Sequence, residues 1–217
     1  IFNDKTTGTP IAMLVRNKDQ QSQDYDDIAT YYRPGHADYT YDAKYGFRDH
    51  RGSGRASGTE TIGRVAAGAI AREILKQLNI IVSAYTKSIG EITIDYDKCK
   101  INSIKESPFS MPDLEASLAV EKLVTQKKEE KDSLGGVIEC IITGVPIGIG
   151  EPVFEKLDAN ISKGILSIGA IKGIEFGAGF EVAKMTGYEN NDCFVSDSNG
   201  CISKESKKNR YKKCRFK

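Results

Sequence analysis

Short apolar runs typical of buried strands alternate with helix-like patterns along this chain, and this alternation restricts the fold to the mixed classes, α/β or α+β. Residues 10–17, 80–86 and 136–143 each form such a run. Residues 167–185 are also strand-like, but their glycines predict a bent backbone or a close approach to another group. With 217 residues, the chain is long enough to bury one substantial core.

Three segments carry helix signals. Ser57 and Glu60 have the spacing of a capping box, and the apolar positions that follow share one helix face as far as Leu78. Residues 113–131 predict a charged surface helix. Glu151-Pro152 predicts the start of a third helix, because proline is favoured in the first turn.

The bulk composition argues against several classes of partner. The formal net charge is +1, which gives no electrostatic reason to expect nucleic-acid or membrane binding. No apolar run approaches the roughly 20 residues that span a bilayer. The five cysteines are scattered and far in sequence from both histidines, so we expect reduced thiols and no metal site. These features predict a cytoplasmic protein.

The last segment differs from the rest. Residues 204–217 contain eight basic residues and one acidic residue, without a helix or strand pattern. We expect residues 201–217 to be a flexible, solvated tail. The alternative is a nucleic-acid-binding arm, but only Tyr211 and Phe216 are present for stacking on bases.

Arginine is concentrated in one window. Residues 33–64 hold five arginines and one lysine, whereas the rest of the chain holds four arginines and 21 lysines. The guanidinium is a planar fork that binds carboxylate or phosphate through two hydrogen bonds, which lysine cannot do. We therefore expect an anionic small molecule to bind here. The alternative is a surface ion-pair network with Asp38, Asp42 and Asp49.

His36 is the candidate for acid–base chemistry in this window. It lies between Gly35 and Ala37, whose small size leaves the imidazole accessible, and Asp38 could orient the ring. A purely structural histidine is the alternative. The nearby glycine-rich residues 52–55 could let backbone amides approach a phosphate or a ring, although they match neither the Walker loop nor G-x-G-x-x-G.

Several of these motifs together resemble chorismate synthase. RPGHAD at residues 33–38 and SGRAS at residues 53–57 are the most specific, and they occur in that family's order and spacing. The resemblance runs from Ile1 to roughly Gly200, as a partial core that is expected to be incomplete at both ends. Further segments that share it are TTGTPI at 6–11, NKDQQSQDY at 17–25, RVAAGA at 64–69 and GVPIGIGEPVF at 144–154.

The resemblance implies a β-α-β sandwich fold, a homotetramer and a lyase of the shikimate pathway of aromatic amino acid biosynthesis. The family's reaction removes phosphate and a ring proton from 5-enolpyruvylshikimate-3-phosphate by anti-1,4-elimination and gives chorismate. Reduced FMN is the implied cofactor, and NADPH is a possible reductant of the flavin. The alternative is a flavin-binding fragment without turnover, because this sequence lacks two family segments that carry a second histidine and an aspartate.

The resemblance also implies roles for individual residues. His36 is expected near the flavin, where it supplies or stabilises a proton. The residues expected to bind substrate are Arg33, Arg48 and Arg51, and those expected to contact FMN are Arg55, Ala56, Ser57, Gly169 and Ala170. Thr59 stands where the family usually has arginine. Ser57 is expected to serve mainly one of two purposes, the helix cap or the cofactor.

Overall fold

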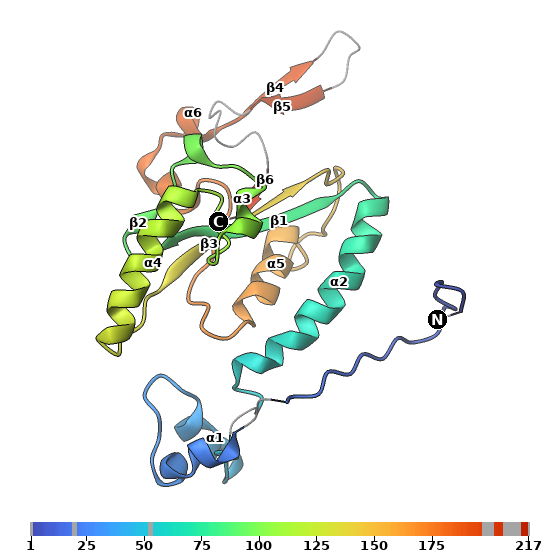
Figure 1. Ribbon diagram of the computed structural model, residues 1–217. Coiled ribbons are helices and arrows are strands. Elements are labelled where there is room, and N and C mark those ends of the chain that lie inside the picture. The colour runs from blue at the N-terminus through green and yellow to red at the C-terminus, as the bar shows by residue number, and fades with distance from the viewer. Residues whose placement is uncertain (1, 19–20, 52–53, 197–201, 206–213, 217) are drawn as a thin grey trace. The chain divides into compact units, whose positions relative to one another are not determined.

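The computed structural model describes residues 2–18, 21–51, 54–196, 202–205 and 214–216. The chain divides into two compact units (Figure 1). The first unit comprises Ile1–Ala71 and Ser167–Ile171, and the second comprises Arg72–Leu166 and Lys172–Lys217. Both helices and strands are present, so the expected mixed α/β class is confirmed.

The second unit contains a four-stranded antiparallel sheet in the order β2-β1-β3-β6. Its strands are β1 (Ile81–Ile89), β2 (Ile92–Thr93), β3 (Gly136–Thr143) and β6 (Cys214–Phe216). The long pair β1 and β3 runs from Ile81 opposite Thr143 to Ile89 opposite Gly136. The β-branched residues of both strands favour this extended pairing.

Helix α4 (Leu114–Glu129) packs on this sheet. Asp113 starts the helix by accepting hydrogen bonds from the backbone nitrogens of Glu115 and Ala116, at 3.0 and 3.2 Å. The apolar core between them is small. Its buried members are Ile94, Met111, Ala116 and Val120.

A buried carboxylate lies on the same face of the sheet as this core. Glu139 of β3 is fully buried and lies directly opposite Tyr85 of β1. The hydroxyls of Tyr85 and Tyr96 donate to its two carboxylate oxygens, each at 2.6 Å. These bonds offset the cost of removing the carboxylate from water.

The remaining elements are short or lie outside the sheet. They are η1 (Ser22–Tyr25), η2 (Asp27–Thr30), α1 (Asp38–Tyr45), η3 (Gly58–Thr61), α2 (Ile62–Gln77), η4 (Tyr96–Lys98), α3 (Ser103–Glu106), α5 (Leu157–Leu166), η5 (Gly179–Lys184), α6 (Gly187–Asn190), β4 (Cys193–Ser196) and β5 (Ile202–Glu205). Strands β4 and β5 form a separate antiparallel pair.

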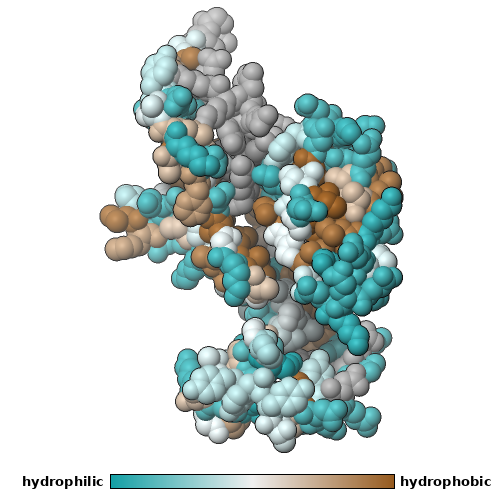
Figure 2. All heavy atoms as spheres, turned by 90° about the vertical axis from the view of Figure 1, so that its left-hand side faces the viewer, coloured by the Kyte–Doolittle hydropathy of each residue, from teal (hydrophilic) through white to brown (hydrophobic). Residues whose placement is uncertain are grey.

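Many large apolar side chains are exposed in the described structure, and Figure 2 shows apolar side chains at the surface of the face that it draws. Leu118 of α4 is 61% exposed, and Phe154 is 86% exposed. No helix among the described residues combines the length and the apolar character that a membrane crossing needs.

Several sequence-based predictions of elements are confirmed. The predicted strand at Gly136–Thr143 is β3, and the helix predicted at residues 113–131 is α4. The helix predicted after Ser57 is α2, preceded by the short η3. The capping box is only half present, because Ser57 caps η3 whereas Glu60 forms an ion pair with Arg64 instead.

Other predictions are wrong. Residues 10–17 form no strand and belong to neither of the described sheets, and Leu14 is 80% exposed. Residues 167–185 form turns and η5, since Gly177 and Gly179 have φ of 62° and 57°, outside the strand region. Helix α5 begins at Leu157 rather than at Glu151-Pro152.

The terminal segment also differs from expectation. Residues 202–205 form β5 and residues 214–216 form β6, so the expected lack of regular structure is wrong for these residues. Their side-chain pattern gave no strand signal, and pairing with β4 and β3 supplies the order instead. The rest of the segment, residues 201, 206–213 and 217, lies outside the described residues.

Candidate functional site

Asp38 is the centre of the predicted arginine window. It is the first residue of α1, and it is 4% exposed. Among the described residues of the first unit, no other residue is buried to this degree. A charged group therefore occupies the place that an apolar core would take in a larger unit.

Arg33 holds Asp38 through both carboxylate oxygens. Its Nε donates to Oδ2 at 2.9 Å, its Nη2 donates to Oδ1 at 2.9 Å, and its backbone nitrogen donates to Oδ2 at 3.0 Å. Gly35, with φ of 69°, allows the tight turn that brings these two residues together. The Arg33 guanidinium, with further hydrogen bonds to the carboxylate, holds the pKa of Asp38 well below its usual range.

His36 lies inside the same turn. Its Nδ1 is 2.9 Å from Asp38 Oδ1 and 3.1 Å from Arg33 Nη2. The side chain is 30% exposed, and no residue that the structure describes bonds to Nε2. The ring is therefore held at Nδ1, and Nε2 has no described partner.

Arg48 ties α1 to the preceding loop. Its Nη2 donates to the carbonyl oxygens of Ile28, Ala29 and Tyr31, at 2.8, 3.1 and 2.8 Å. The side chain is only 6% exposed. It also stacks over the ring of Tyr32, with 5.3 Å from Cζ to the ring centroid.

One nitrogen of Arg48 is poorly satisfied. Nη1 lies 3.2 Å from Asp38 Oδ1, but it is not aligned for a hydrogen bond with that atom or with any other described atom. A buried donor without an acceptor costs free energy, about 1–3 kcal/mol. An oxygen atom of a bound anion could recover it.

Ser57 and its neighbours lie on the other side of this site. The Ser57 hydroxyl oxygen accepts from the backbone nitrogen of Thr59 at 3.3 Å and from the Thr59 hydroxyl at 3.0 Å. Arg55 is exposed and forms no ion pair with a described residue. Gly52 and Ser53, which belong to the predicted glycine-rich stretch, lie outside the described residues.

The second predicted flavin segment is held near the start of α2. Arg64, in the first turn of that helix, donates to the carbonyl and hydroxyl oxygens of Ser167, both at 3.0 Å from Nη2. Gly169 and Ala170 follow directly. Ala170 has φ of 68°, a left-handed conformation that is strained for alanine and that often occurs at functional sites.

A pocket of about 230 Å³ gathers part of the predicted site. Its lining includes five predicted residues: Arg33, His36, Arg48, Ala56 and Ser57. The other predicted residues, Arg51, Arg55, Gly169 and Ala170, do not line it. Tyr25 and Tyr41 also line the pocket, and no pattern in the sequence marked them as site residues.

The ion-pair network that the sequence left open as an alternative is present. Asp38 pairs with both Arg33 and Arg48, and the exposed Arg51 pairs with Asp49 through a two-point contact. That contact lowers the pKa of Asp49. Arg55 is the arginine of the window without a described ion pair, so it is the one most available to a ligand.

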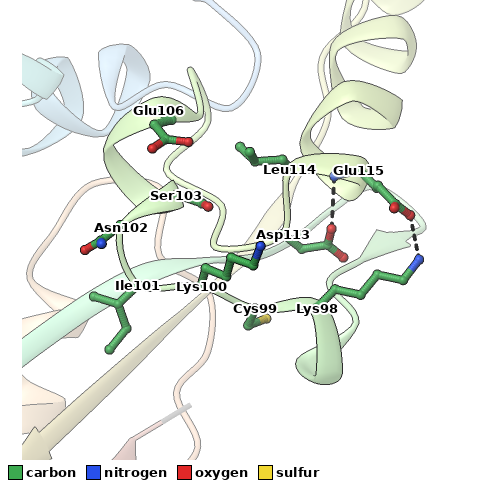
Figure 3. A pocket seen from close by; sticks show the side chains of 10 residues that line it. All are labelled: Lys98, Cys99, Lys100, Ile101, Asn102, Ser103, Glu106, Asp113, Leu114 and Glu115. Atoms are coloured by element: carbon green, nitrogen blue, oxygen red, sulfur yellow. Dashed lines mark hydrogen bonds and ion pairs between the residues drawn. The ribbon is translucent and has the colours of Figure 1, made fainter.

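A larger surface pocket, of about 920 Å³, lies in the second unit around η4, α3 and the start of α4 (Figure 3). Three of its five charged side chains, those of Lys98, Asp113 and Glu115, have described partners. Lys98 pairs with Glu115 at 2.5 Å, and Asp113 accepts hydrogen bonds from the helix backbone (Figure 3). It contains no histidine and none of the predicted site residues.

This chain is similar to several known proteins. The family model for chorismate synthase matches residues 1–211, which extends past the boundary expected near Gly200. Chorismate synthase from Lachnoclostridium phytofermentans is 62% identical over 204 residues, covering 94% of this chain and 56% of that protein. Chorismate synthase from Lachnospira eligens is 61% identical over 195 residues, covering 90% of this chain and 53% of that protein.

A solved structure, described as the crystal structure of chorismate synthase, has a TM-score of 0.72 and 30% identity. The similarity covers 79% of this chain and 55% of the solved chain. The chain thus spans about half the length of the curated relatives it matches. On these matches, the chain belongs to the chorismate synthase family.

Proposed function

We propose that this chain supplies the acid–base histidine and part of the substrate and flavin sites of a chorismate synthase. The reaction is the conversion of 5-enolpyruvylshikimate-3-phosphate to chorismate and phosphate. The observation that carries the proposal is the pocket that His36 lines together with Arg33, Arg48 and Ser57. A proton-transfer group and anion-binding groups in one pocket are what this elimination requires.

The pocket suits an anionic group rather than a whole ligand. Its volume of about 230 Å³ is below the roughly 300–1,000 Å³ usual for small-molecule sites. The unsatisfied Nη1 of Arg48 offers a buried donor to a carboxylate or phosphate oxygen. Part of the substrate would occupy this pocket, with Arg33 and Arg48 opposite its negative charge. The third predicted substrate ligand, Arg51, stays a prediction.

The residues near Ser57 are compatible with a flavin. The Ser57 oxygen uses its lone pairs to accept from Thr59, so its hydroxyl hydrogen is left to donate to a cofactor oxygen. The helix cap and the cofactor contact therefore do not compete. Arg55 would add a guanidinium fork beside them. Reduced FMN, when bound, would lend an electron transiently that helps phosphate to leave.

Other properties of the family are proposals for this chain. They include Ala56, Gly169 and Ala170 as flavin contacts, NADPH as a possible reductant, a homotetramer and a place in the cytoplasm. The strained φ of Ala170 supports the second contact segment.

The test is His36→Ala in a full-length relative such as the 62% identical one, with reduced FMN under anaerobic conditions. The turnover number should fall by about 100- to 10,000-fold, the usual contribution of an acid–base group, while the Michaelis constant changes little. His50→Ala is the control, because His50 does not line the pocket. A rise in the Michaelis constant alone would make His36 a binding residue.

Flavin binding is tested separately on the chain itself, by quenching of flavin fluorescence. If the chain binds FMN but forms no chorismate, the alternative of a flavin-binding part without turnover holds for this chain alone. If it binds no FMN, the proposed flavin contacts are wrong.

A further inference from the structure

Asp38 is a buried charge that contacts Arg33, His36 and Arg48, three of the residues that line the pocket. Its Oδ1 receives Arg33 Nη2 and His36 Nδ1, each at 2.9 Å, and lies 3.2 Å from Arg48 Nη1. With three positively charged or donor groups around it, this carboxylate stays ionised and accepts hydrogen bonds only.

An ionised carboxylate decides which nitrogen of a neighbouring imidazole carries the proton. Since Asp38 Oδ1 can only accept, the 2.9 Å contact to His36 requires a hydrogen on Nδ1. Nε2 then has its lone pair, or its acidic proton when the ring is charged, free of any described partner.

The contact between Arg33 and His36 favours the other tautomer. Arg33 Nη2 lies 3.1 Å from the same Nδ1 and could donate to it, which would place the proton on Nε2. Nη2 carries two hydrogens and also donates to Asp38 Oδ1, at the shorter distance of 2.9 Å. A lone pair on Nδ1 would repel the ionised oxygen of Asp38 at 2.9 Å, whereas a hydrogen there makes a charge-assisted bond to it. The two contacts therefore predict opposite tautomers, and the distances favour the one set by Asp38.

The geometry points to Asp38 as a positioning residue that fixes His36 in the tautomer with hydrogen on Nδ1, and so presents Nε2 to the ligand. Asp38 acts through His36 and does not touch the ligand itself. The catalytic use of Nε2 rests on the proposed function. The tautomer of His36 does not, because it can be measured without flavin or substrate.

The test is ¹H–¹⁵N correlation NMR of the imidazole nitrogens in the 217-residue chain, at a pH where free imidazole is neutral. The sequence has two histidines, so His50→Gln leaves the signals of His36 alone. We expect Nδ1 to give the shift of a protonated ring nitrogen and Nε2 that of an unprotonated one. The opposite pattern overturns the proposal.

A pair of variants separates positioning from simple loss of structure. Asp38→Asn keeps the size of the side chain but replaces a carboxylate oxygen by an NH₂ group, which donates hydrogen bonds. Among the neighbours of residue 38, the imidazole of His36 can change from donor to acceptor at Nδ1, whereas the arginines can only donate. We expect the hydrogen to move to Nε2. Asp42→Asn is the matched control, because Asp42 pairs with Arg48 Nε at 3.6 Å and makes no described contact with His36.

The outcomes are distinct. A changed tautomer in Asp38→Asn with an unchanged one in Asp42→Asn supports the proposal, and circular dichroism checks that both variants keep their helices. If Asp38→Asn loses its helices, the proposal is accepted or rejected on the tautomer measured for His36 in the wild-type chain. If both folded variants keep hydrogen on Nδ1, Asp38 does not set the tautomer. Failure of the activity test with a confirmed tautomer would reject the proposed function and leave this inference standing.

Discussion

Arg48→Met tests whether the first unit depends on a polar centre rather than an apolar core. Methionine has a similar length, but it removes the donors to three carbonyl oxygens, of Ile28, Ala29 and Tyr31, and the charge beside Asp38. Removing one partner of a buried ion pair costs about 3–5 kcal/mol, and domains are stable by only about 5–15 kcal/mol. No apolar residue among those described in this unit is buried enough to compensate.

The assay is hydrogen exchange of the backbone amides of α1, measured residue by residue. At about 1.4 kcal/mol per factor of ten, a loss of 3 kcal/mol accelerates exchange through local opening by more than 100-fold. Arg51→Met is the matched control, because the Arg51 side chain is 65% exposed in its pair with Asp49, and it should leave the exchange unchanged. Equal protection of α1 in wild type and Arg48→Met would refute the reasoning.

Two further predictions concern the same window. Arg55→Lys keeps the charge but loses the guanidinium fork, so isothermal titration should show an affinity for FMN lower by about 10- to 100-fold. The control Arg72→Lys, on α2, should bind FMN as the wild type does. Equal affinities of the two variants would mean that Arg55 does not contact the flavin. The pKa of Asp38 lies below its usual range in the folded chain, so its contribution to stability is present above about pH 4 and is lost as the pH falls further. The protection factors of α1 should therefore fall progressively as the pH is lowered below about pH 4 in wild type. A similar fall in Asp38→Asn would assign it to other groups.

The sequence was sufficient where structure is local. Helix α4 and strand β3 follow from patterns within their own residues, and α2 follows Ser57 as its signals indicated. The same holds for part of the site. Arg33, His36 and Asp38 lie within six residues of one another, so a single turn is enough to bring them together.

Predictions of strands from the sequence were wrong where the strand depends on a neighbouring strand. Residues 10–17 have the composition of a strand, but a strand forms only when a neighbouring strand accepts and donates its backbone hydrogen bonds. This segment belongs to neither of the described sheets. Residues 202–205 and 214–216 show the converse, since β4 and β3 give them a strand conformation that their composition did not indicate.

The sequence by itself determined the family, the local turn around His36 and the presence of an arginine-rich window. Only the tertiary structure decided what each arginine does. Arg48 is buried because it reaches carbonyl oxygens 17–20 residues away, Arg64 binds Ser167 across 103 residues, and Arg55 is left without a described ion pair. The same residue type thus serves structure or ligand according to which acceptors the folded chain places beside it, and distances between residues far apart in sequence are not encoded in any local pattern.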